Sequence, residues 1–183
     1  DCGYWFRLPV KSGAMSQQSD PSILSPLGKP TEYRSTYAPE LLYPIPRQLK
    51  RDELGISAAS LPFVGEDIWN AYEVSWLNPR GKPVVALATF WVPATSPNLV
   101  ESKSLKLYLN SFNQTAFADA SAVEATLRRD LSAAAGAPVS GKIEVLSSRP
   151  QPTLGYPQGI LLDDLDIACD TYQPAPHQLV AVD

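Results

Sequence analysis

The distribution of proline along the chain limits where regular structure can form. Of its 18 prolines, seven lie within residues 9–46 and six within residues 138–176, but none lies between Pro97 and Pro138. Because proline fixes φ and lacks a backbone donor, dense proline is typical of loops and strand edges, whereas a proline-free stretch can hold helices. We therefore expect an extended arm with little regular structure over residues 15–65, and helices between positions 97 and 138.

Composition and charge exclude several classes of protein. With 44% apolar residues among 183, the chain can bury a core, and its length fits one or two domains. Its net charge of −4 is unfavourable for electrostatic binding to the negatively charged phosphates of nucleic acid, so no direct nucleic-acid partner is expected. No apolar run reaches the roughly 20 residues of a membrane span. With so few cysteines, a reducing compartment is favoured, and we expect a cytoplasmic protein without a membrane partner.

Cysteine and histidine are scarce. The sequence holds Cys2, Cys169 and His177 and no further residue of these two types, which is too few for a structural zinc site. A catalytic zinc held by His177 and distant carboxylates stays open as an alternative. Cys169 alternates like a core position and is expected to pack in the core, while His177 is expected at the surface. Residues 1–14 lack the apolar centre of a signal peptide, so we interpret them as upstream sequence before a natural start at Met15.

A long antiparallel hairpin is expected in the middle of the chain. Residues 67–77 place aromatic and β-branched residues at a period of two, which predicts a strand. In a regular strand one face carries Ile68, Asn70, Tyr72, Val74 and Trp76, and the other carries Trp69, Ala71, Glu73, Ser75 and Leu77. Asn78 to Gly81 have the composition of a turn, with proline in second place and glycine in fourth. Residues 83–93 then predict the returning strand.

Two helices are expected after the hairpin. The first covers about residues 102–112, because apolar side chains recur there at helical spacing. They are Leu105, Leu109 and Phe112. The second begins at Ser121, which has the spacing of a capping box with Glu124, and it ends at Gly136.

Two more strands complete the expected order. Ile143 and Val145 alternate and predict a third strand, and residues 161–167 predict a fourth. The order is then β-β-α-α-β-β, an α+β domain with both helices on one face of an antiparallel sheet.

The segment Glu101-Ser102-Lys103-Ser104 stands where a strand gives way to a helix. In a purely structural interpretation, Ser102 or Ser104 caps the helix and the two charged residues are solvated. In a functional interpretation, unpaired N–H groups of the first turn and Lys103 attract an anion. Glu101 then accepts two parallel N–H donors, such as the N1–H and exocyclic amine of a guanine-like base.

Four stretches resemble one enzyme family. Residues 67–78 and 101–115 resemble segments of the NADPH-dependent 7-cyano-7-deazaguanine reductases, the nitrile reductases of queuosine biosynthesis in tRNA modification. Residues 42–47 and 163–167 match as well, so the resemblance covers about residues 26–175. It implies the N-terminal half of the long form of these oxidoreductases, which has a tunnelling fold (T-fold) in each half. The β-β-α-α-β-β order agrees with that fold.

The resemblance also implies domain limits and assembly. The T-fold domain would cover residues 66–173, and residues 174–183 would begin a linker to a catalytic half that is absent from this chain. T-fold proteins generally close their barrels by association, so a homo-oligomer is expected, because a lone domain exposes sheet edges.

Roles for four residues follow from the resemblance alone. Val100, Glu101 and Ser102 match the segment that binds the 7-deazaguanine substrate, and Ser102 and Lys103 match contacts to NADPH. In the family a cysteine thiolate attacks the nitrile, and two hydride transfers then give the aminomethyl product. That cysteine lies in a segment resembling C-x-x-T-x-Q-P-D, which is missing here. No catalytic residue and no metal ligand is therefore assigned, and the chain alone is expected to be inactive.

Two alternatives stay open. The chain could be a stand-alone T-fold module that holds a deazaguanine or pterin-like base without reacting it. Zinc-dependent hydrolysis of a purine ring on the same fold is disfavoured, because the Cys and His ligands it needs are absent from the sequence.

Overall fold

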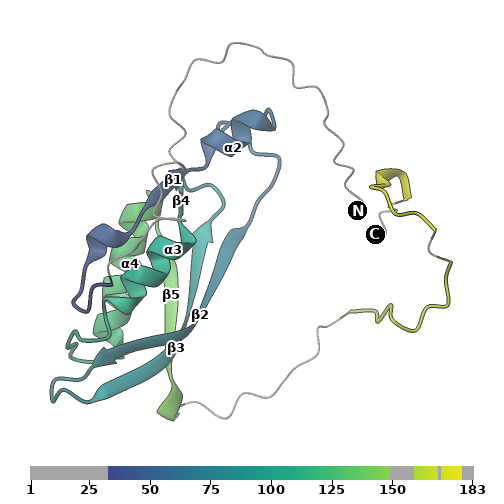
Figure 1. Cartoon of the computed structure of the whole chain (residues 1–183). Coiled ribbons are helices and arrows are strands. Elements are labelled where there is room, and N and C mark those ends of the chain that lie inside the picture. Colours follow the sequence, from purple (N-terminus) through teal and green to yellow (C-terminus); the bar gives the residue numbers. More distant parts are fainter. Residues whose placement is uncertain (1–32, 149–158, 169, 179–183) are drawn as a thin grey trace, which may run out of the picture. The chain divides into compact units, whose positions relative to one another are not determined.

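The hairpin predicted from the alternating pattern forms two strands of a three-stranded antiparallel sheet. Strand β2 (Glu66–Leu77) pairs with β3 (Pro83–Pro93), and β5 (Ser140–Val145) adds to the other side of β3 (Figure 1). The turn closes with the N–H of Gly81 donating to the carbonyl of Asn78 at 2.9 Å, and Gly81 takes a φ of 78° that favours glycine. The computed structural model describes residues 33–148, 159–168 and 170–178.

A β-bulge in β2 overturns the predicted division of its side chains between two faces. Ala71 pairs with Ala88 and Val74 with Ala86, so β2 carries one extra residue at this point. The core side therefore receives Trp69 and Ala71 before the bulge, and Val74 and Trp76 after it. Ile68 and Tyr72, expected beside Val74, are instead 62% and 77% exposed.

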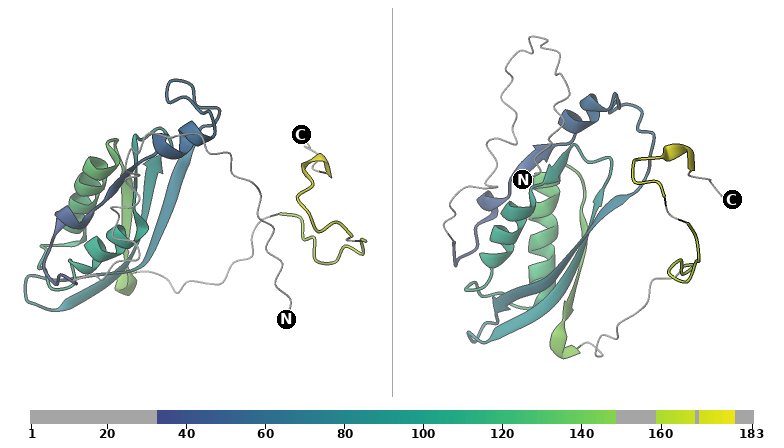
Figure 2. Two further views of the ribbon diagram at one scale, coloured as in Figure 1. Left: turned by 45° about the horizontal axis from the view of Figure 1, so that its top comes forward. Right: turned by 45° about the vertical axis from the view of Figure 1, so that its right-hand side comes forward.

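Both predicted helices pack on one face of this sheet, where they enclose the core (Figures 1 and 2). Helix α3 (Ser102–Asn110) and helix α4 (Ala120–Ala135) lie close to their expected limits. The sheet contributes Val74, Trp76, Ala86, Ala88, Phe90 and Val92 to the core, and the two helices contribute Leu105, Tyr108, Leu109, Val123, Leu127, Leu131 and Ala135. The α+β arrangement expected from the sequence is confirmed.

Helix α4 begins with a different cap from the one predicted, but it ends at the predicted residue. Asp119 is the N-cap, and its side chain accepts a 2.8 Å hydrogen bond from the N–H of Ala122. The predicted capping box at Ser121 is therefore wrong, and Glu124 accepts from the N–H of Ile143 instead. At the other end Gly136 caps the helix with a φ of 70°, as predicted.

The proline-rich arm contains more regular structure than the sequence predicts. It includes the 3-10 turn η1 (Pro39–Leu41), strand β1 (Pro44–Pro46) and helix α2 (Gln48–Glu53). Strand β1 pairs antiparallel with β4 (Asn98–Val100), which leads directly into α3. The arm is thus tied to the chain segment that precedes Glu101.

Contacts divide the chain into two units, Asp1–Pro150 and Gln151–Asp183. In the second unit, the expected strand over residues 161–167 is wrong, because these residues form a turn, with the N–H of Leu165 donating to the carbonyl of Leu162. A 3-10 turn, η3 (Pro176–Gln178), follows, and His177 is exposed as expected. Cys2, Cys169 and residues 1–14 lie outside the described residues.

Candidate functional site

Glu101 forms the N-cap of α3. It follows the buried Val100 of β4 in extended geometry, and its side chain folds back onto the first turn of the helix. Its Oε1 accepts a 2.8 Å hydrogen bond from the N–H of Lys103, and its Oε2 accepts one of the same length from the N–H of Ser104. Neither serine is the N-cap, and Glu101 is only 5% exposed rather than solvated.

This capping changes what the helix start offers to a ligand. The N–H groups of Lys103 and Ser104, expected to attract an outside anion, already bind the carboxylate of Glu101. Ser102 remains exposed, and its hydroxyl lies 3.4 Å from Oε1 of Glu101. These two first-turn N–H groups are therefore not available to an outside anion.

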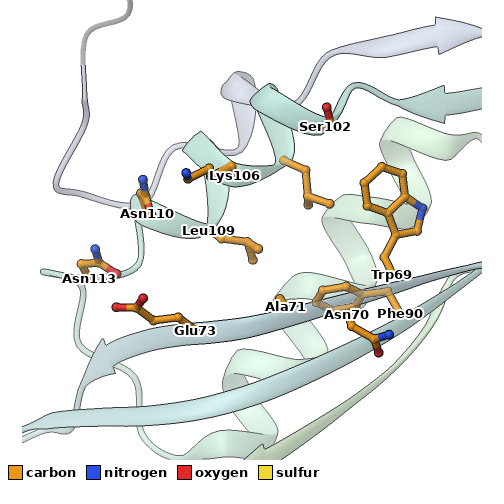
Figure 3. Close-up of a pocket in the computed structure, with 11 residues that line it drawn as sticks. Trp69, Asn70, Ala71, Glu73, Phe90, Ser102, Lys106, Leu109, Asn110 and Asn113 are labelled. Atoms are coloured by element: carbon orange, nitrogen blue, oxygen red, sulfur yellow. The ribbon is translucent and has the colours of Figure 1, made fainter.

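A pocket of about 300 Å³ lies beside this helix start, between β2 and α3 (Figure 3). This volume is at the lower end of the range for small-molecule sites. Its apolar lining consists of Trp69, Ala71, Phe90, Leu105 and Leu109, and its polar lining consists of Asn70, Glu73, Ser102, Lys106, Asn110 and Asn113. An aromatic and aliphatic floor with a polar rim suits a flat heterocycle that carries polar or anionic substituents.

The structure separates the four residues predicted for binding. Ser102 lines the pocket, whereas Val100 is buried in the core, and Glu101 and Lys103 are outside the pocket lining. Lys106 and Asn110 also line the pocket and were not predicted, although they follow Ser102 at intervals of four on one face of α3. Trp69 and Glu73 were not predicted as site residues either, although the alternating pattern placed both on one face of the strand.

A second group of ionisable side chains lies where the arm, α3 and α4 meet. Asp130 accepts 2.6 Å hydrogen bonds from the hydroxyls of Tyr37 and Tyr108 through Oδ2, and a 2.9 Å bond from Nε of Arg129 through Oδ1. Burial and the adjacent carboxylate raise the pKa of Tyr37 to about 12 and also raise the pKa of Tyr108. None of these residues lines the pocket, so the cluster links elements of the fold rather than forming a second site.

The described residues contain neither a cluster of metal-ligating side chains nor a membrane-spanning helix. Across residues 33–148, 159–168 and 170–178, no group of three or more His, Cys, Asp or Glu side chains is arranged to hold a metal ion. In the same part of the chain, no helix is long and apolar enough to cross a membrane.

The described part of the chain is thus a small α+β domain with a pocket between β2 and α3. Residues 33–143 match the sequence model of the family described as nitrile reductase, 7-cyano-7-deazaguanine-reductase, N-terminal, and the chain belongs to this family. The family resemblance inferred from the sequence is thereby confirmed.

Three curated relatives are each named NADPH-dependent 7-cyano-7-deazaguanine reductase. The relative from Dechloromonas aromatica (strain RCB) is 68% identical over 164 residues, which is 90% of this chain and 58% of the relative. Those from Aromatoleum aromaticum and Azoarcus sp. (strain BH72) are 66% and 65% identical, over 83% and 87% of this chain. The chain therefore spans little more than half the length of the curated relatives it matches.

Proposed function

We propose that this chain is the N-terminal half of an NADPH-dependent nitrile reductase that converts 7-cyano-7-deazaguanine into 7-aminomethyl-7-deazaguanine in queuosine biosynthesis. The family match over residues 33–143 carries the proposal, together with relatives of that name. The T-fold domain proposed over residues 66–173 is supported within residues 66–145, where β2, β3 and β5 form an antiparallel sheet with α3 and α4 on one face. The outer edges of β2 and β5, which have no paired strand among the described residues, support association into a homo-oligomer. The proposed cytoplasmic location rests on the low number of cysteines.

Glu101 is the proposed acceptor for the edge of the 7-deazaguanine base. An ionised carboxylate offers about four lone-pair sites, and capping of α3 uses one on each oxygen. The remaining sites are suited to a base N1–H and exocyclic amine, with the hydroxyl of Ser102 and the backbone of Val100 beside them. In this proposal the same carboxylate caps the helix and binds the substrate.

The side chains around the pocket fit a dinucleotide phosphate. NADPH supplies hydride when it is bound. Ser102 and Lys106 line the pocket, and Lys103 lies in the first turn of α3 beside Ser102. In this proposal, these side chains bind the phosphate in place of the helix N–H groups that are bonded to Glu101. Because exposed lysine charges are screened by salt, cofactor binding is expected to weaken as the salt concentration rises.

The attacking thiol is proposed to come from the C-terminal half, since the C-x-x-T-x-Q-P-D segment is missing from this sequence. The test compares NADPH consumption with 7-cyano-7-deazaguanine by this chain and by the full reading frame that contains it. Turnover by the full protein and none by this chain is the expected result. If this chain alone consumes NADPH with the nitrile, and the Cys169→Ala variant still does so, the proposal that the attacking thiol comes from the C-terminal half is wrong. A full reading frame that binds the base without turnover would instead support a non-catalytic module.

A further inference from the structure

Ser104 is a buried serine in the first turn of α3, with 0% of its surface exposed. Its hydroxyl donates a 2.7 Å hydrogen bond to the carbonyl of Glu101 and accepts a 3.0 Å bond from the N–H of Tyr43 in the arm. One side chain thus joins the proline-rich arm to the residue proposed to bind the substrate.

The arm holds Glu101 from a second direction. The N–H of Glu101 donates to the carbonyl of Tyr43 at 2.9 Å, so both backbone polar groups of Tyr43 are used around the helix start. Strand β1 begins next to this contact, with Pro44 opposite Val100. Pro44 and Pro46 have no N–H to donate to β4, and the arm is bonded on either side of β1 by Tyr43 and by Arg47, whose N–H donates to the carbonyl of Pro97 at 3.0 Å.

A second buried serine provides an internal comparison at the other end of α3. The hydroxyl of Ser111 accepts a 3.1 Å hydrogen bond from the N–H of Ala38 and donates a 2.6 Å bond to the carbonyl of Tyr108. Ser111 is also 0% exposed. Both serines therefore join the arm to α3 by the same pair of bonds, but Ser104 alone of the two contacts Glu101.

We propose that Ser104 is a positioning residue that acts through Glu101, so that the arm sets the orientation of the carboxylate toward the substrate. Three groups of Glu101 are fixed by named partners: its N–H by Tyr43, its carbonyl by Ser104, and its carboxylate by the first turn of α3. This inference rests on the substrate role proposed for Glu101. It adds that loss of a hydroxyl outside the pocket lining weakens substrate binding.

The test uses the full-length protein with Ser104→Ala and with Ser111→Ala as its matched control. Each variant removes one buried hydroxyl and leaves one arm N–H unpaired, so both are expected to lower the melting temperature by a similar amount. The Kd of 7-cyano-7-deazaguanine, measured by calorimetry, is expected to rise about three- to tenfold for Ser104→Ala and less than about twofold for Ser111→Ala. In turnover, Ser104→Ala should raise KM for the nitrile and leave kcat unchanged, because the proposed contact holds substrate and transition state alike.

A second variant separates orientation from folding. Ser104→Thr keeps the hydroxyl but adds a methyl group at a fully buried position, so it should lower the melting temperature and preserve the affinity for the nitrile. Equal affinities for Ser104→Ala and wild type, or equal losses for Ser104→Ala and Ser111→Ala, would show that Ser104 only stabilises the fold. Lack of nitrile binding by the wild-type protein would instead overturn the proposed function, whatever the serine variants do.

Discussion

The hydroxyl of Tyr37 donates a 2.6 Å hydrogen bond to Oδ2 of Asp130, which lies 93 positions further along the chain. This bond joins the arm to α4, and Asp130 also binds Tyr108 of α3. One carboxylate therefore holds three separate parts of the chain together.

Removal of either tyrosine hydroxyl should destabilise the protein. Tyr37→Phe or Tyr108→Phe takes one donor from a largely buried carboxylate, and a hydrogen bond to a charged group contributes roughly 1.5–3 kcal/mol. We expect a loss of about 1–3 kcal/mol in the free energy of unfolding, with the larger effect at Tyr108, which is fully buried. Urea unfolding provides the measurement, and Tyr72→Phe, at a 77% exposed side chain, is the matched control. Equal midpoints for all three variants would contradict this role.

The same cluster predicts a loss of stability in alkali. The pKa of Tyr37 rises from 10.0 to about 12, so the folded protein holds this proton more tightly than the unfolded chain does. The unfolded state loses the proton first as the pH rises, and the stabilisation declines between pH 10 and about pH 12. The slope of unfolding free energy against pH in that window should be steeper for wild type than for the double variant Tyr37→Phe/Tyr108→Phe. Identical slopes would refute this linkage.

Two substitutions at Glu101 separate its capping from its proposed binding role. Glu101→Gln replaces one acceptor oxygen with a donor, so one first-turn N–H loses its partner, and we expect about 0.5–2 kcal/mol of destabilisation. Aspartate is a preferred N-cap, so Glu101→Asp should restore most of that stability. Its shorter side chain withdraws from the substrate, however, so both variants should weaken nitrile binding by about tenfold or more in the full-length protein. Thermal melts and calorimetry test the two effects independently, and wild-type affinity in both variants would remove Glu101 from the substrate site.

Gly136 should tolerate alanine less well than Gly81 does. Both glycines have positive φ, at 70° and 78°, so alanine strains the backbone at each by about 1–2 kcal/mol. A Cβ at Gly136 would also lie 2.6 Å from Cγ of Pro97, whereas nothing lies within 4 Å at Gly81. Gly136→Ala is therefore expected to lower the unfolding free energy by more than Gly81→Ala. Equal losses would show that the contact with Pro97 relaxes without cost.

Local patterns were sufficient to predict most of the sheet and both helices. The turn residues around Gly81 and the apolar spacing in α3 act over a few positions, so they can be recognised without a partner. The expected strand at residues 161–167 failed because strand formation depends on an edge to pair with, which the alternation of side chains does not reveal. Similarly, Asp119 and Ser121 are both suitable caps, and only the geometry of the helix start distinguishes them.

The candidate site was predicted less completely than the fold. The composition of the Glu101–Ser104 segment correctly placed a strand-to-helix junction, but it could not show that the carboxylate turns back onto its own helix. Lys106 and Asn110 could have been found by continuing the helical spacing from Ser102. The alternation in residues 67–77 already put Trp69 and Glu73 on one face, but it could not show that this face meets α3, because that contact depends on the packing of the whole domain.

The extra residue in β2 makes the length of this strand as important as its composition. Because of this residue, Trp69 and Trp76 lie on one side of β2 although they are an odd number of positions apart. Deletion of Tyr72 would restore regular pairing and keep both side chains on that side, since their separation would become even. Insertion of one further residue between them would put them on opposite sides unless a second bulge formed, so either Trp69 would leave the pocket or Trp76 would leave the core. Insertions within β2 are thus expected to be far less tolerated than deletion of Tyr72 or substitutions at its exposed positions.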